Sequence, residues 1–359
     1  MSENKIISFT RGVPPPESLP ISRLAQCADE VLKEESGLVL QYGHAAGYSP
    51  LREAIAAQAG IDSTRVVIGQ GSLQLLDHVV RLLVKPADVV LVEQPTYDRT
   101  LTLLRRAGAQ VIGIDLEEDG LSIELLESEL KKGLKPVLFY MIPDFQNPTG
   151  NVMSSTKRRR LLELANRYGF LVVEDAPYRT LRYSGETLPS LFELDREHVL
   201  QMSSFSKLIS PGLRVGYAIL PPALALRVIK FAEDTYINAS FLNQAMVHRF
   251  IQKGWMDSQL EALKNLYSQR LGSLLLALEE NMKEKGDWNH PQGGFFVSFT
   301  VRRELENAEL IQNAENAGLR LSDGRGFFVQ GGQSFIRLPF CALTPAEIQT
   351  GIQRLAQIL

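Results

Sequence analysis

The sequence predicts an α/β protein with two domains, a large one built on a mostly parallel mixed sheet covered by helices and a smaller α+β one. Three observations predict this class. At 359 residues the chain is too long for one small core. Between about residues 50 and 220, short apolar, β-branched segments alternate with helical patterns, which is typical of a parallel sheet. After residue 222 the alternation stops, and a long amphipathic pattern over 257–282 indicates a helix that connects two domains.

The first 220 residues supply the elements of the large sheet. Apolar residues at helical spacing predict a helix over 21–34, and the prolines at 14–16 predict a stiff extended segment before it. The same periodicities predict helices over 51–59, 73–84 and 100–107, and strands over 66–68, 89–92, 110–114, 137–142, 171–174, 199–203 and 217–220. In such sheets ligands bind at the carboxyl ends of the strands.

After residue 222 we expect helices over 223–236 and 241–253, and the last eighty or so residues have the pattern of a smaller α+β unit. In that unit we expect strands over 295–300, 319–322 and 335–338, and a last helix with Thr344 as N-cap and Pro345 at its first position. The predicted organisation is an N-terminal segment, 1–48, that contributes to the small domain and the active site. A large cofactor-binding domain over 49–255 and a small C-terminal domain over 256–359 follow.

Composition narrows the class of protein. A net charge of −3 gives no reason to expect nucleic acid or an anionic membrane as partner, and no segment has the unbroken apolar length of a membrane span. The one basic run, 157–160, has no interleaved aromatic residue, so we interpret it as a solvated helix face. Two cysteines, Cys27 and Cys341, favour a reducing compartment and no metal site. A cytoplasmic enzyme is the expectation.

Three polar segments, 147–150, 174–178 and 203–207, each follow a predicted strand. They offer the amide of Asn147, the carboxylate of Asp175, the phenol of Tyr178 and, after several serines, the amine of Lys207. Pyridoxal 5′-phosphate needs this set, because a lysine forms its Schiff base, an acid pairs with its ring nitrogen, and hydroxyls and amides hold its phosphate. Singly, each residue has an ordinary alternative, such as a surface lysine or a loop aspartate.

Further residues fit the same cofactor. Gly69 to Ser72 precede a helix, where backbone amides bind anions, although Gly-x-Gly is also common as turn geometry alone. Tyr97 follows another strand and could stack on a flat ring or simply fill the rim of the core. Arg337 lies within an apolar strand, so it needs an anionic partner if buried, and its planar guanidinium matches a carboxylate.

At this point the chain resembles the class I/II pyridoxal-phosphate-dependent aminotransferases of fold type I, from about Ile7 to the C-terminus. It is most similar to the branch of 2-aminoadipate and kynurenine aminotransferases and the catalytic domain of MocR-type regulators. The resemblance rests on the segments 7–9 with Gly12 and Pro14, 40–42 with Gly47, 147–150, 174–178 and, most specifically, 203–217.

The resemblance implies a role for each matching residue. Lys207 would form the Schiff base and carry the proton, Asp175 would pair with the ring nitrogen, and Tyr97 would stack on the ring. Asn147 and Tyr178 would hold the ring oxygen. Arg337, Asn147 and the Gly12 backbone would bind the substrate carboxylate. The phosphate would be held by Ser72, the amide of Leu73, Ser204, Ser206, Arg214 and, from the neighbouring subunit of a homodimer, Tyr42.

Two positions depart from the branch. Leu73 stands where glutamine is usual, so a side-chain contact is lost and the backbone amide remains. Arg11 stands where glycine is usual, beside the substrate loop. It could redirect specificity toward an acidic side chain, or it could point to solvent or a dimer interface.

The resulting prediction is an aminotransferase that moves the amino group of an L-amino acid to a 2-oxo acid by a ping-pong mechanism. A lyase, a decarboxylase or a biosynthetic cyclase or oxidase on the same scaffold is the alternative, because function resides in the site rather than in the fold. A non-enzymatic sensor that binds the cofactor to regulate a partner is a third interpretation, disfavoured by the complete catalytic set.

Overall fold

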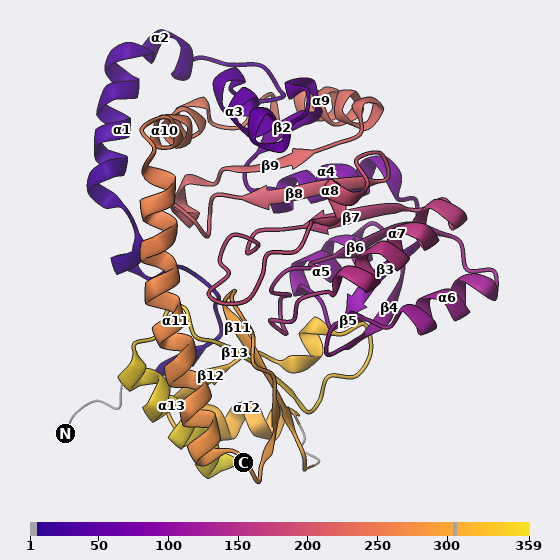
Figure 1. The fold of residues 1–359 in the computed structure, drawn as a ribbon, viewed down its shortest axis with the longest axis vertical. Coiled ribbons are helices and arrows are strands. Elements are labelled where there is room, and N and C mark those ends of the chain that lie inside the picture. The colour runs from indigo at the N-terminus through magenta and orange to yellow at the C-terminus, as the bar shows by residue number, and fades with distance from the viewer. Residues whose placement is uncertain (1–5, 304–306) are drawn as a thin grey trace.

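A computed structural model describes residues 6–303 and 307–359 of the chain. Its centre is an eight-stranded sheet in the order β2-β9-β8-β7-β6-β3-β4-β5 (Figure 1). The neighbours from β8 through β4 are all parallel, whereas β9 and β5 pair antiparallel with their neighbours. The predicted mostly parallel sheet is therefore confirmed. In chain order the strands are β2 (Val66–Gly69), β3 (Val89–Gln94), β4 (Gln110–Glu117), β5 (Gly120–Leu121), β6 (Pro136–Met141), β7 (Leu171–Asp175), β8 (Val199–Ser204) and β9 (Gly216–Ile219).

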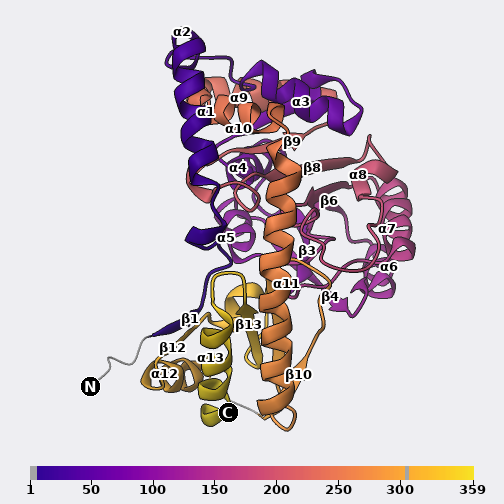
Figure 2. The same ribbon diagram turned by 60° about the vertical axis from the view of Figure 1, so that its left-hand side comes forward.

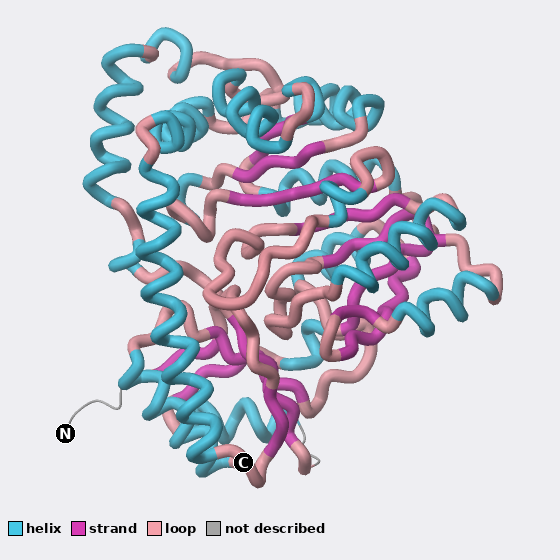
Figure 3. The backbone as a smooth tube through the Cα atoms, viewed as in Figure 1, coloured by secondary structure: helices cyan, strands magenta, loops and turns pink. Residues whose placement is uncertain are grey.

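Both faces of the sheet are buried, and the alternation of side chains along β6 shows how. Leu138 and Tyr140 belong to one hydrophobic cluster, whereas Phe139 and Met141 belong to another. Helices cover both sides of the strands in the tube drawing (Figure 3). These helices are α3 (Ser49–Ala59), α4 (Ser72–Leu83), α5 (Asp98–Arg106), α6 (Ile123–Lys131), α7 (Ser155–Tyr168), α8 (Leu191–Leu194), α9 (Pro222–Tyr236) and α10 (Phe241–Gln252).

A smaller α+β unit follows the long helix α11 (Trp255–Asn281), which runs alongside both parts of the molecule (Figure 2). Strands β10 (Gly286–Trp288), β11 (Phe296–Val301) and β13 (Phe335–Pro339) form an antiparallel sheet. Strand β1 (Ile7–Phe9) pairs in parallel with β12 (Leu319–Leu321), which attaches the N-terminal segment to this unit. Helices α12 (Asn307–Asn316) and α13 (Pro345–Ile358) complete it, and Thr344 caps α13 as expected. The domain boundaries at 48/49 and 255/256 stay predictions.

The N-terminal segment crosses from one part of the molecule to the other. After β1, a short 3₁₀ turn at Pro16–Ser18 follows the expected extended stretch, and the helix predicted over 21–34 forms as α1 (Ile21–Glu34). This helix packs against α10, and α2 (Ser36–Val39) leads into the loop before α3 (Figure 1). No helix in the described chain has both the length and the apolar character that crossing a bilayer requires.

The basic run 157–160 is only in part the solvated helix face that the sequence predicted, since the Lys157 side chain is mostly buried and pairs with Glu117 and Asp119. Arg159 is exposed, but the Arg158 side chain is fully buried and pairs with Asp144, with Nη2 2.7 Å from Oδ1. It also donates to three backbone carbonyls, those of Met153, Pro143 and Pro189. The interpretation of the whole run as a solvated helix face is therefore wrong for Arg158, because the periodicity of α7 turns this position toward the loop after β6.

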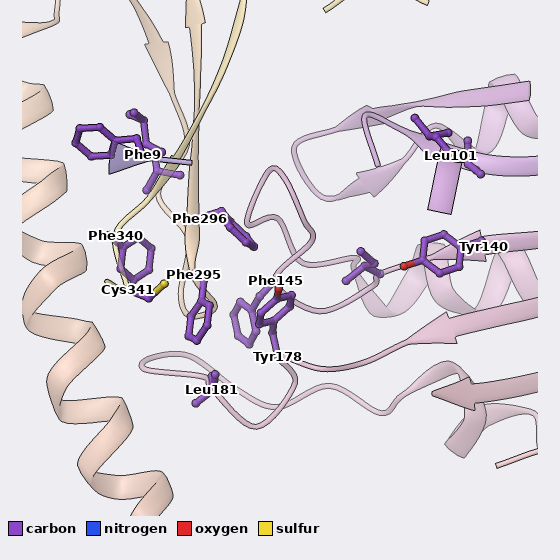
Figure 4. Close-up of a cluster of buried hydrophobic side chains, with 14 of the residues drawn as sticks. Phe9, Leu101, Tyr140, Phe145, Tyr178, Leu181, Phe295, Phe296, Phe340 and Cys341 are labelled. Carbon is purple, nitrogen blue, oxygen red and sulfur yellow. The ribbon is translucent and has the colours of Figure 1, made fainter. Parts of the chain in front are cut away.

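Aromatic side chains fill the space between the large sheet and the small unit. Tyr178 packs against Phe295 and Phe296, with ring centroids 5.3 and 5.7 Å away, and the close-up shows the three rings together (Figure 4). Phe295 also contacts Tyr267 of α11 edge-on at 4.9 Å. This aromatic layer fixes where the small unit lies against the carboxyl ends of β6, β7 and β8.

Candidate active site

A cavity of about 300 Å³ lies where the carboxyl ends of the central strands meet the N-terminal segment and the small unit. Every residue that the sequence predicted for the site lines this cavity, with the exception of Tyr42. The predicted residues brought together are Arg11, Gly12, Ser72, Leu73, Tyr97, Asn147, Asp175, Tyr178, Ser204, Ser206, Lys207, Arg214 and Arg337.

Lys207 lies in the turn after β8 and points at the N-terminal segment. Its Nζ donates to the carbonyl oxygen of Gly12 at 3.0 Å and lies 5.9 Å from the Phe295 ring centroid. Burial lowers the pKa of Lys207, and the guanidinium groups of Arg214 and Arg337 add to this effect. A buried amine with a lowered pKa can serve as a nucleophile and a base.

Asp175 ends β7 and is the buried carboxylate of the cavity. Its Oδ2 accepts a hydrogen bond of 2.7 Å from the hydroxyl of Tyr140, whereas its Oδ1 is buried without a partner. Burial raises the pKa of Asp175 to about 6, despite the bond from Tyr140 and the nearby Lys207. An unpartnered buried acceptor is costly to maintain, so its position here fits a donor carried by a ligand.

The N-terminus of α4 forms a cradle for an anion. Gly71, its N-cap, has φ +85°, and a Cβ at Gly71 would lie 2.5 Å from Nη2 of Arg214. A Cβ at Gly216 would lie 2.3 Å from the backbone nitrogen of Ser72. The hydroxyls of Ser204 and Ser206, 2.9 Å apart, face the same cavity. Free amides, hydroxyls and a guanidinium around a space without side chains suit a phosphate.

Arg337 on β13 is a buried cation. Its Nη1 donates to Oδ1 of Asn147 at 3.0 Å and its Nη2 to the carbonyl of Thr10 at 2.7 Å, whereas its Nε has no partner. The side chain is sandwiched between the rings of Phe296 and Phe327, 4.9 and 4.5 Å from the two centroids. No carboxylate of the described chain forms an ion pair with it, so the site is ready for an external anion.

The two predicted tyrosines occupy different depths. Tyr178 is buried against Phe296, and burial raises its pKa. Tyr97 is the N-cap residue of α5 and is half-buried at the cavity wall, where burial raises its pKa to about 12. Both phenols therefore remain protonated and can donate hydrogen bonds at neutral pH.

Three positions that the sequence singled out have distinct outcomes. Leu73 lines the cavity from the first turn of α4 and leaves only its amide as a polar group there. Arg11 is exposed and lines the cavity mouth, so both interpretations of it stay open. Tyr42 lies outside the cavity with 81% of its surface exposed.

Sequence reasoning missed three residues at or beside the site. Tyr140 lies near the carboxyl end of β6, and its phenol within an otherwise apolar strand was the available signal, since a buried hydroxyl requires a partner. Arg99 and Asp98 line the cavity mouth from the start of α5, and nothing in the local sequence distinguishes them from ordinary exposed residues. Among the described residues, no cluster of potential metal ligands was found.

Comparisons with known proteins agree with this geometry. Residues 4–355 match the family model of aminotransferase class I and II. The aromatic-amino-acid aminotransferase 1 of Thermococcus litoralis is 33% identical over 99% of this chain and 88% of its own length. The mitochondrial kynurenine/alpha-aminoadipate aminotransferase of Mus musculus is 27% identical over 99% of this chain and 92% of its own.

A solved structure agrees over nearly the whole chain. The alpha-aminoadipate aminotransferase of Thermus thermophilus, crystallised with N-(5′-phosphopyridoxyl)-L-leucine, superposes with a TM-score of 0.94 at 33% identity. The match covers 98% of this chain and 92% of that one. These relatives confirm the branch expected from the sequence.

Proposed function

This chain belongs to the class I and II aminotransferases, and we propose that its two half-reactions follow a ping-pong mechanism in the cavity around Lys207. The enzyme uses pyridoxal 5′-phosphate to transfer the amino group of an amino acid to a 2-oxo acid. Among the described residues that line the cavity, Arg337 is the single buried arginine, and it offers one binding position for a substrate carboxylate. The amino donor and the 2-oxo acceptor would therefore bind at the same position one after the other, which supports a ping-pong order.

The observation that carries this proposal is a set of unused bonding groups in one cavity. Among the described residues, Oδ1 of Asp175 has no donor, Nε of Arg337 has no acceptor, and the N-terminus of α4 has no side-chain cap. A protonated ring nitrogen, a substrate carboxylate and a phosphate are the groups that would satisfy them. The chain's residues therefore fit the cofactor and an amino acid together.

We assign the roles from these contacts. When bound, pyridoxal phosphate supplies an electron sink for the carbanion at the substrate α-carbon. Lys207 Nζ would take a proton from the substrate α-carbon and deliver one to C4′ of the cofactor, and its lowered pKa favours this by increasing the share of free amine at neutral pH. Arg337 and Asn147 bind the substrate carboxylate, and Tyr97 covers the cofactor ring. The phosphate is held by Ser72, Ser204, Ser206, Arg214 and the Leu73 amide. The ring oxygen is held by Asn147 and Tyr178.

A panel of amino acids with 2-oxoglutarate or pyruvate tests the reaction. We expect parallel lines in double-reciprocal plots of initial rate, and formation of the pyridoxamine form from donor alone. Lys207→Ala should lose turnover while folding normally. Turnover by Lys207→Ala would refute the assignment, and intersecting lines would refute the ping-pong order.

Arg11 is our candidate for substrate choice. Its exposed side chain lines the mouth of the cavity together with Arg99, so two guanidinium groups border the path of a substrate side chain. We propose that Arg11 favours an acidic side chain. The comparison is kcat/KM for dicarboxylic and neutral donors in wild type and in Arg11→Gly, with Arg23→Gly, which lies outside the cavity, as control. An unchanged ratio in Arg11→Gly would refute this role.

We further propose that the enzyme is a homodimer in which Tyr42 reaches the phosphate of the neighbouring subunit. Tyr42 is 81% exposed although it is aromatic. The next residue, Gly43, donates its backbone N–H to Asn238 at 3.2 Å, beside the half-exposed Tyr236 and Ile237. An apolar surface of this kind suits association with a second copy.

Subunit mixing tests the shared site. We expect Lys207→Ala and a Tyr42→Ala variant each to be poorly active, and a refolded 1:1 mixture to recover about a quarter of wild-type activity through hybrid dimers. A mixture no more active than its parents would refute a site shared between subunits.

The free, buried Cys27 and Cys341 support our proposal of a cytoplasmic enzyme, which cell fractionation can check.

A further inference from the structure

Gln146 lies directly before Asn147 and is buried, with 2% of its surface exposed. Its side-chain amide makes all four hydrogen bonds available to it. Nε2 donates to the carbonyl of Pro95 at 2.7 Å and to Oε2 of Glu93 at 3.2 Å, and Oε1 accepts from the backbone N–H and the hydroxyl of Thr149, both at 2.9 Å.

These bonds join two loops that are about fifty residues apart in the sequence. One is the loop after β6, which carries Asn147, and the other is the loop after β3, in which Pro95 lies two residues before Tyr97. Glu93, itself 2% exposed, accepts from the backbone N–H of Ile142 at 2.9 Å through the same oxygen that Gln146 uses. Glu93 therefore anchors both the start of the β6 loop and the amide of Gln146.

The backbone at this point is strained in a way that turns Gln146 inward. Phe145 has φ +54°, which is unusual for a bulky residue. The backbone of Gln146 also closes its own loop, because its N–H donates to the carbonyl oxygen of Asn151 at 2.9 Å and its carbonyl accepts from the N–H of Gly150. Strain at a residue fixed by its surroundings is common near functional sites.

We propose that Gln146, held by Glu93, is a positioning residue that fixes Asn147 and Tyr97 relative to each other. It touches neither cofactor nor substrate in this arrangement, since neither Gln146 nor Glu93 lines the cavity. Asn147, which binds the substrate carboxylate, and Tyr97, which covers the cofactor ring, thus keep the same relative position through both half-reactions. This inference rests on the roles proposed above for Asn147 and Tyr97.

The test replaces the amide with an apolar side chain of similar length. We expect Gln146→Met to lower kcat/KM by about 10- to 100-fold, the range for a displaced but intact site. Hydrogen exchange of the holoenzyme should become faster in 95–101 and in 142–151 together. Glu93→Gln keeps an acceptor oxygen and should stay within about threefold of wild type, whereas Glu93→Leu should resemble Gln146→Met.

Gln201→Met is the matched control, because Gln201 also donates its amide to a buried glutamate, Glu174, at 2.9 Å, yet this bond joins β8 to β7 and contacts neither of the two loops. A loss in Gln146→Met no greater than in Gln201→Met, or exchange that rises in one loop alone, would overturn the proposal. If Gln146→Met does not fold, Thr149→Val removes one bond to the amide and should show the same coupled exchange at smaller amplitude.

Two further variants separate this proposal from the roles on which it rests. Asn147→Ala and Tyr97→Leu report on those roles directly, because the first removes the amide and the second removes the ring. If both retain full activity, the assigned roles fail, while the coupled exchange in Gln146→Met still decides whether the two loops are held together.

Discussion

Asp175→Asn should stabilise the cofactor-free protein while it inactivates the enzyme. The Asp175 carboxylate is 7% exposed, has Tyr140 as its one hydrogen-bond donor, and leaves Oδ1 unpartnered. Asparagine has the same shape and can still accept from Tyr140, but it carries no charge. The substitution therefore removes a buried charge that Tyr140 and the nearby Lys207 offset only in part in the cofactor-free protein.

The magnitude follows from the pKa of Asp175. Burial raises that pKa to about 6 in the folded protein, against about 3.9 in an unfolded chain. The folded state therefore binds the proton more tightly, and the free energy of unfolding falls as pH rises from about 4 to about 6. A difference of about 2 pKa units corresponds to about 3 kcal/mol of lost folding stability. This loss is complete above pH 6, where the carboxylate is charged, and absent below pH 4.

Thermal or urea unfolding of both cofactor-free proteins between pH 4 and pH 8 measures this difference. We expect the advantage of Asp175→Asn to grow by about 3 kcal/mol from pH 4 to pH 7.5, which raises Tm by roughly 3–6 °C in a protein of this size. Asp98→Asn removes an exposed carboxylate of the same cavity and should leave the difference near zero. Turnover of the loaded Asp175→Asn enzyme should fall by roughly 100-fold or more.

If the difference in free energy of unfolding between Asp175→Asn and wild type does not change across this pH range, the reasoning is refuted. The charged Asp175 carboxylate would then not destabilise the folded protein. Lower stability of Asp175→Asn at pH 7.5 would also refute it. Retained turnover with raised stability would keep the electrostatic argument and remove Asp175 from the chemistry.

Three other predictions concern single contacts. Tyr140→Phe removes the hydrogen-bond donor to Asp175, so the Asp175 carboxylate should take up a proton at a higher pH. The pH below which cofactor affinity declines should then rise by about one unit, measured by absorbance titration at pH 5–8. An unchanged midpoint would exclude this contact as the cause. Arg337→Met should lower kcat/KM by roughly 100-fold, with Tm unchanged or raised, because the cation has no acidic partner in the described chain; a strong loss of Tm would contradict this. Gly71→Ala should weaken cofactor binding about tenfold and lower Tm, since its φ is +85° and the new Cβ would lie 2.5 Å from Arg214. Gly212→Ala, where the nearest atom would be 3.6 Å away, serves as its control, and equal effects of the two would refute the steric argument.

The sequence alone determined the large sheet and the cofactor. Strands and helices with strong local periodicity, such as β6 and α1, form close to their predicted bounds, because the hydrophobic pattern that defines them is contained within each segment. The residues that we propose for the cofactor site follow strand ends in a fixed order, and the parallel connection of these strands brings such ends to one edge. Lys207, Asp175 and Asn147 could therefore be placed together in advance.

Only the tertiary structure decided features that depend on partners distant in the chain. Strand β1 has three residues and forms because β12, about three hundred residues later, pairs with it. Arg158 is buried because Asp144 lies opposite it, which a run of four basic residues conceals. Tyr140, Glu93 and Gln146 form hydrogen bonds between segments 35 to 53 residues apart, beside the proposed site, and such contacts leave no local periodicity in the sequence. The sequence thus specifies which groups we propose for the chemistry, and the packing of distant segments determines how those groups are placed.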